Sequence, residues 1–89
     1  MSSVVEMPDR RGLVAAVAEN VRVAAARRGW SQSDLARALG WATSTVSVRW
    51  FGRRQWQLEE LEDVAEALGV SVQGLIQYTA RDSNPEPAD

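Results

Sequence analysis

Apolar residues recur at three- and four-residue spacing along most of the chain and predict an all-α fold of five helices. The first helix is expected from about residue 9 and ends at Gly29. The fourth is expected over residues 58–68 and ends at Gly69, and Ser71 can cap a fifth. The residues expected to face the core are Leu13, Val17, Val21 and Ala24 in the first helix and Leu58, Leu61, Val64, Ala65 and Leu68 in the fourth.

Two short helical patterns lie on either side of Gly40, between Trp30 and Gly52. Ser31 and Asp34 have the spacing of a capping box, and Trp30 and Leu35 occupy the positions of a hydrophobic staple. A second helix is therefore expected to begin after Ser31 and to end at Gly40 in a left-handed conformation.

The third helix is expected to begin at Thr43 or Ser44. Val46 and Trp50 are four residues apart and should face inward. Its other faces carry small, mostly hydroxyl-bearing side chains, namely Thr43, Ser44, Ser47 and Val48. A helix, a glycine turn and a second helix with this outer face have the layout of a helix-turn-helix.

Length and composition favour one small globular domain of 89 residues. We expect residues 1–8 to form a flexible arm, residues 9–79 the helical domain, with Asp9 as a possible cap, and residues 80–89 a disordered acidic tail. The chain has no Cys and no His, so we expect no metal site and no other cofactor. No signal peptide or membrane-spanning run is visible, and an intracellular protein is expected.

The formal net charge of −2 conceals a strong asymmetry along the chain. Residues 10–54 carry nine arginines and two acids, a balance of +7, whereas residues 55–89 carry one arginine and eight acids, a balance of −7. A fold that separates these two segments can present a basic surface to phosphate and an acidic surface away from it. The alternative is that charges segregate by helix without a function.

The segments SQSDLARALGWATSTVSVRWFGRR and LEELEDVAEALGVSVQGLI together resemble the phage-repressor and Cro type of DNA-binding domain, most closely its actinobacterial and phage members. The resemblance runs from about Leu13 to Tyr78. It implies a five-helix, lambda-repressor-like helix-turn-helix domain that binds double-stranded DNA as a homodimer. The fifth helix and its flanks are the expected dimer interface.

In this family the third helix enters the major groove, so the resemblance implies base contacts from Thr43, Ser44, Ser47 and Val48. It implies phosphate contacts from Gln32, Thr45, Arg49, Arg53 and Arg54. The base-facing side chains offer no bidentate pairing, so phosphate contacts, water and DNA shape should carry more of the specificity than usual. Ala42 stands where the family usually has a Ser or Thr cap, and Thr43 is an alternative cap that would then not read bases.

The favoured function is a small transcriptional regulator, a repressor or Cro-like protein, in the bacterial cytoplasm and associated with the nucleoid. We expect no membrane association and no small-molecule ligand. The alternative is a protein-interaction module such as an antitoxin, whose acidic fourth helix or tail binds a partner. An enzyme is disfavoured because the sequence offers no nucleophile-base pair, phosphate loop or metal set. The carboxylates of the fourth helix are interpreted as a solvated face.

Overall fold

The computed structural model describes residues 10–77, and this range contains five helices and no strand. They are α1 (Arg10–Arg27), α2 (Gln32–Leu39), α3 (Thr43–Trp50), α4 (Leu58–Leu68) and α5 (Val72–Ile76). The all-α, five-helix fold expected from the sequence is confirmed. The expected arm, the acidic tail and the cap at Asp9 lie outside the described residues.

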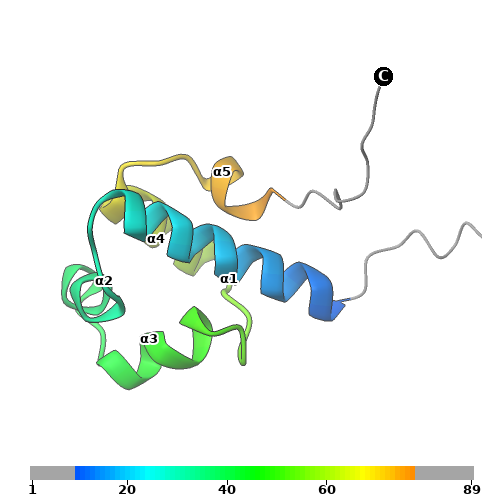
Figure 1. Ribbon diagram of the computed structural model, residues 1–89, viewed down its shortest axis with the longest axis horizontal. Coiled ribbons are helices and arrows are strands. Elements are labelled where there is room, and N and C mark those ends of the chain that lie inside the picture. The colour runs from blue at the N-terminus through cyan, green and yellow to red at the C-terminus, as the bar shows by residue number, and fades with distance from the viewer. Residues whose placement is uncertain (1–9, 78–89) are drawn as a thin grey trace, which may run out of the picture.

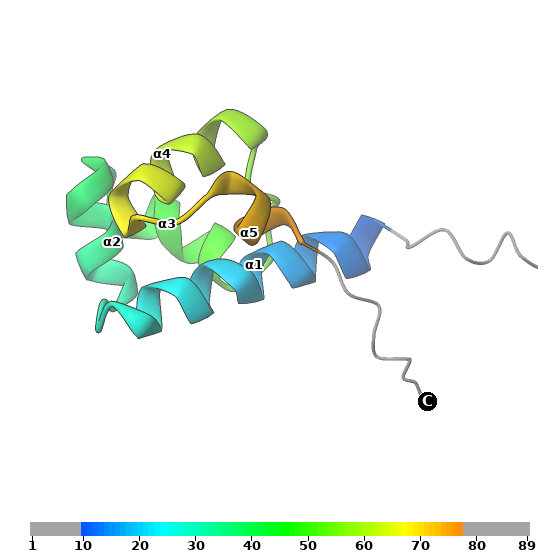
Figure 2. The same ribbon diagram turned by 90° about the horizontal axis from the view of Figure 1, so that it is seen from above.

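The long helix α1 packs against α3, α4 and α5, while α2 packs against α3 and α4. Figure 1 shows α5 on one side of α1 and α3 on the other. Seen from above, α4 lies beside α1 with α5 across the pair, and the N-terminal end of α1 extends beyond the shorter helices (Figure 2). This arrangement leaves α2 and α3 together on the side of the molecule away from α5.

The largest fully buried side chains come one from each helix and share a single core, and these are Val21, Leu35, Val46, Val64 and Leu75. Trp56, from the connector between α3 and α4, joins this core with only 6% of its surface exposed. The placement of Val46 agrees with the sequence expectation. Trp50 is half-buried and packs against the same cluster, as expected of an inward residue. Because all five helices share one core, α3 can shift only if its neighbours repack.

Two apolar residues expected in the core are exposed instead. Leu13 is 40% exposed and Leu58 is 63% exposed. Leu13 lies in the part of α1 that extends past the other helices, and Leu58 is the first residue of α4, so neither has enough neighbours to cover it. The expected Val21 is fully buried together with Ala18 and Ala25, and the expected Val17 and Ala24 are partly buried against the same core.

The helix ends of the central pair follow local sequence signals. Ser31 Oγ accepts from the Asp34 amide at 3.3 Å, and Asp34 Oδ2 accepts from the Ser31 amide at 2.9 Å, completing the capping box. Gly40 ends α2 with φ of 74°, a left-handed conformation that glycine adopts without strain. The expected hydrophobic staple is consistent with Trp30, which packs against the core cluster that contains Leu35.

Candidate nucleic-acid interface

Helix α3 is held in place from three directions. Val46 anchors it to the core. Arg22 of α1 donates from Nη1 to the carbonyl of Trp50, the last residue of α3, and so satisfies a free C-terminal carbonyl. Arg49 of α3 pairs with Glu60 of α4. These contacts fix the position and the direction of α3 relative to α1 and α4.

The Arg49 guanidinium is held within the protein by each of its nitrogens. Nε donates to Glu60 Oε1 at 3.1 Å and Nη2 donates to Glu60 Oε2 at 3.3 Å, a bidentate pair. Nη1 donates to the Thr45 carbonyl at 2.9 Å, and the group lies 5.5 Å from the centre of the Trp41 ring. The side chains of Arg49 and Glu60 are only 13% and 18% exposed. The pattern of the sequence did not predict this pair, because the partners lie on different helices; a phosphate contact by Arg49 stays a prediction.

The outer face of α3 carries the predicted base-contacting residues. Thr43 and Ser44 are exposed, Ser47 and Val48 are half-buried, and the predicted phosphate contact Thr45 is exposed. Ala42 is the N-cap residue and provides no side-chain cap. The alternative in which Thr43 caps the helix is therefore wrong, since Thr43 is the first helical residue. The structure leaves Thr43 on the exposed first turn, and amides of an uncapped first turn are suited to an anionic oxygen.

The connector places two predicted phosphate contacts beside the end of α3. Arg53 and Arg54 are exposed, and both of their amides donate to the Val48 carbonyl, at 2.9 and 3.1 Å. Within residues 10–77 neither side chain forms an ion pair. Gly52 begins the turn with φ of 78°, and a Cβ there would lie 3.6 Å from the Cβ of Ala18. The backbone of both arginines is thus hydrogen-bonded to α3.

A phosphate contact by Gln32 requires an accessible side chain at the start of α2, and the structure covers part of this side chain. The residue is half-buried, and its Oε1 is buried without a hydrogen-bond partner among the described residues. Its backbone lies directly after the Ser31 cap, so the side chain belongs to the first turn of α2. The predicted phosphate contact by its carboxamide stays a prediction.

The first turn of α2 also carries a charge pair. The pKa of Asp34 is held below its usual value of 3.8, chiefly by the hydrogen bond from the Ser31 backbone amide and further by Arg37, whose Nη1 lies 3.1 Å from Oδ1. The Arg37 side chain is 75% exposed. An ionised Asp34 therefore stabilises the N-terminal end of the helix that supports α3.

Two stacked tryptophans stabilise the turn before α3. The rings of Trp41 and Trp56 stack with centroids 6.0 Å apart and planes inclined by 26°. Trp41 precedes the N-cap Ala42, and Trp56 belongs to the core. The sequence pattern did not predict that Trp56 supports the start of α3, because the two rings lie fifteen residues apart in the chain.

Four of the five acidic residues of α4 are exposed. Glu59, Glu62, Asp63 and Glu66 are exposed. Among the described residues no cluster of three or more acidic, Cys or His side chains is arranged to hold a metal ion. None of the described helices is both long enough and apolar enough to cross a membrane.

Comparison with known proteins gives consistent matches. The profile of a helix-turn-helix family, HTH_3, matches residues 21–75. A Neisseria hypothetical transcription factor from Neisseria meningitidis serogroup B is 38% identical over 73 residues, which cover 80% of this chain and 67% of the relative. The crystal structure of the hypothetical transcription factor NHTF from Neisseria has a TM-score of 0.72 and 35% identity, with coverage of 86% of this chain and 88% of the other. That of the clp gene regulator ClgR from C. glutamicum has a TM-score of 0.71 and 27% identity, covering 83% and 96%.

Proposed function

The chain belongs to the helix-turn-helix family HTH_3, and from this premise we propose that it is a sequence-specific, double-stranded-DNA-binding transcriptional regulator. The observation that carries the proposal is the arrangement of α3: the helix is anchored from behind by Val46, Arg22 and the Arg49–Glu60 pair. Its outer face of small side chains lies next to two exposed arginines. The similar chains from Neisseria and C. glutamicum, named as a transcription factor and a gene regulator, support the same function.

In the proposed complex α3 lies in the major groove. Thr43, Ser44, Ser47 and Val48 face base edges, where hydroxyls can bond several bases and Val48 can contact a thymine methyl group. Thr45, Arg53 and Arg54 contact phosphate, and the amide nitrogen of Gln32 donates to a phosphate oxygen. We assign Arg49 a positioning role in addition to any phosphate contact, because its donors hold α3 to α4.

We further propose that the protein acts as a repressor or Cro-like regulator and binds as a homodimer to two related half-sites. One such module buries little DNA surface, so two modules are needed for the affinity and site length of a typical regulator. A relation to actinobacterial and phage members stays a proposal; one of the similar structures is a gene regulator from C. glutamicum.

A second candidate function is protein interaction, with DNA binding secondary. The observation in its favour is the exposed acidic face of α4, which projects Glu59, Glu62, Asp63 and Glu66. A cationic partner would bind there, as an antitoxin binds its toxin. A pull-down with the wild type and with a variant that replaces these four carboxylates by amides would identify such a partner.

The primary test is a fluorescence-anisotropy titration against the DNA upstream of the coding sequence and against a scrambled duplex, at two salt concentrations. We expect a preference of about a thousandfold for the native duplex and an affinity that falls steeply with salt. Equal or absent binding of both duplexes at physiological salt would contradict the proposal and favour the interaction module.

The same assay tests how the sequence is read. Ser44→Ala and Val48→Ala should each weaken native binding moderately, because neither side chain makes a bidentate base contact. If either substitution abolishes the preference for native DNA while non-specific binding is unchanged, readout is direct and the proposed contribution of DNA shape is wrong.

A further inference from the structure

The outer face of α3 continues past the last residue of the helix to Phe51. Phe51 is the C-cap residue, and its amide donates to the Ser47 carbonyl at 3.1 Å, the hydrogen bond that an α-helix makes four residues back. Its Cα therefore keeps the helical register. Spacings of seven and three residues place Phe51 on the same face as Ser44 and Val48. Since both belong to the proposed base-contacting set, Phe51 lies at the C-terminal end of that surface.

The Phe51 ring is exposed and does not belong to the core. Its exposed fraction is 53%, and it is not one of the partly buried apolar residues that pack against the core cluster. A single exposed apolar residue needs no explanation on most protein surfaces. On α3, however, the other outer side chains are small and mostly hydroxyl-bearing. A large ring in line with them is placed to contact whatever α3 binds.

A positive charge accompanies the ring. The Cζ atom of Arg53 lies 5.4 Å from the centre of the Phe51 ring, a cation–π contact. Arg53 and Arg54 are exposed, and neither forms an ion pair within residues 10–77. The face of an aromatic ring is negative and repels a phosphate, whereas a guanidinium over that face attracts one. Ring and cation together match a DNA strand, in which apolar sugar surface alternates with anionic phosphate.

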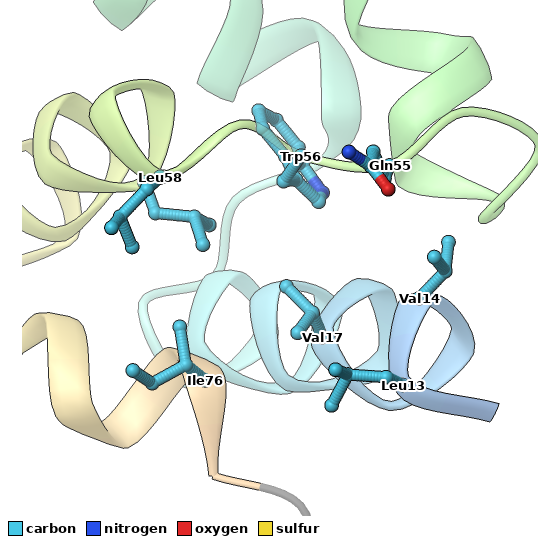
Figure 3. A pocket seen from close by; sticks show the side chains of 8 residues that line it. Leu13, Val14, Val17, Gln55, Trp56, Leu58 and Ile76 are labelled. Atoms are coloured by element: carbon cyan, nitrogen blue, oxygen red, sulfur yellow. The ribbon is translucent and has the colours of Figure 1, made fainter. Parts of the chain in front are cut away.

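Other exposed apolar side chains of the described chain gather at a different place. Leu13, Leu58 and Ile76 are between 39% and 63% exposed. They line a hollow between α1, α4, α5 and the connector, whose labelled side chains are shown in Figure 3. The lining does not include Phe51 and contains no charged side chain. The hollow thus lacks the positive charge that makes the surface at Phe51 complementary to phosphate.

We propose that Phe51 contacts the DNA backbone: its ring packs against a deoxyribose at the wall of the major groove and holds the Arg53 guanidinium towards the adjacent phosphate. The inference rests on the proposed function, since it requires DNA to bind at α3, and it adds a residue to those expected from the sequence. A sugar suits this position better than a base, because the N-terminal residues of such a helix contact base edges. Every nucleotide has a sugar, so the contact contributes affinity and orientation without selecting a sequence.

The composition of the chain allows this ring to be observed directly. Phe51 is the only phenylalanine in the sequence, so protein produced with 4-fluorophenylalanine carries one fluorine label. In fluorine NMR its signal should shift when the duplex from upstream of the coding sequence is added. The shift of the signal between light and heavy water should decrease at the same time, because the sugar excludes water from the ring. Without DNA the signal should not depend on protein concentration.

Anisotropy titrations at two salt concentrations measure what the contact contributes. Phe51→Ala should weaken binding to the native and the scrambled duplex alike by about tenfold, with an unchanged salt slope because both arginines remain. Phe51→Leu keeps most of the apolar area and should bind within about threefold of the wild type. Ile76→Ala is the matched control. It truncates an apolar side chain, 39% exposed, on α5, which lies on the other side of α1 from α3 (Figure 1), and should change binding by less than about twofold.

A double-mutant cycle tests whether the ring acts partly through Arg53. In the Arg53→Ala background, Phe51→Ala should weaken binding only about threefold, because the ring then has no guanidinium to hold. Effects that multiply fully would overturn the coupling between the two side chains. Thermal unfolding of each variant should match that of the wild type, since both side chains are exposed, and this separates a lost contact from a lost fold.

Failure of this inference can be told apart from failure of the proposed function. If the wild type binds neither duplex, DNA binding is wrong and the sugar contact is wrong with it. If the wild type binds DNA, but the fluorine signal does not move and Phe51→Ala binds within about twofold of the wild type, only the contact by Phe51 is overturned. An effect confined to the native duplex would assign the ring to a base. A fluorine shift that follows protein concentration without DNA would assign it to a protein contact, and either result overturns the sugar contact.

Discussion

The pair between Arg49 and Glu60 should couple the stability of the fold to the position of α3. Two hydrogen bonds of 3.1 and 3.3 Å join the partners, and both side chains are more than four-fifths buried. Glu60 Oε1 also accepts from the Gln57 amide at 2.8 Å, so the carboxylate caps α4 as well. Arg49→Met keeps an apolar stem against Trp41, and Glu60→Gln keeps an acceptor for Gln57 while removing the charge.

The expected energy lies between two limits. Solvent-exposed ion pairs contribute about 0–1 kcal/mol, whereas removing one partner of a fully buried pair costs about 3–5 kcal/mol. With 13% and 18% of the side chains exposed, we expect each single substitution to destabilise the protein by about 1.5–2.5 kcal/mol. The coupling energy of the double-mutant cycle should be about 1–2 kcal/mol.

Urea unfolding of the wild type, the two single variants and the double variant measures this coupling. A coupling below about 0.5 kcal/mol would show that the pair behaves as an exposed one and would refute the reasoning. DNA binding of the same variants provides a second readout. If Arg49 acts by positioning, Glu60→Gln should weaken DNA binding without changing its salt dependence, whereas loss of a phosphate contact in Arg49→Met would make the salt slope shallower by about one.

Three further predictions concern other parts of the site. Arg53→Ala and Arg54→Ala should each weaken binding to all DNA sequences about equally and reduce the salt slope by about one; an effect limited to one base position would argue against phosphate contact. Val46→Ala, which opens a cavity in the core, should cost about 2 kcal/mol in urea unfolding, against less than about 1 kcal/mol for the half-buried Val48→Ala. Because the pKa of Asp34 is lowered on folding, its stabilising contribution is fully present above the usual value of 3.8 and is lost as the pH falls through the lower folded-state value. Asp34→Asn should therefore flatten this part of the acid unfolding curve, and an unchanged curve would show that the capping box contributes nothing.

Local signals in the sequence predicted most of the helix boundaries. The Ser31 cap with Asp34, and the left-handed Gly40 and Gly69, act over three or four residues, so their effect does not depend on the rest of the fold. The same holds for the start of α3 at Thr43, one of the two positions expected.

The buried faces were predicted less well near the helix ends. Periodicity states which residues share a face, but it does not state where a neighbouring helix stops. Leu13 and Leu58 share a face with core residues and are nevertheless 40% and 63% exposed, because no neighbour covers the ends of their helices. Periodicity alone would have assigned both side chains to the core, whereas the structure leaves them on the surface.

The sequence by itself determined the number and order of the helices, the residues on the outer face of α3 and the separation of positive from negative charge, because caps, periodicity and composition are local properties. Only the tertiary structure decided what holds α3 in place. Arg49 meets Glu60 across eleven residues, Arg22 reaches Trp50 across twenty-eight, and Trp41 stacks on Trp56. Such contacts depend on how the helices pack around a shared core. The pattern along the sequence does not predict which distant side chains this packing brings together.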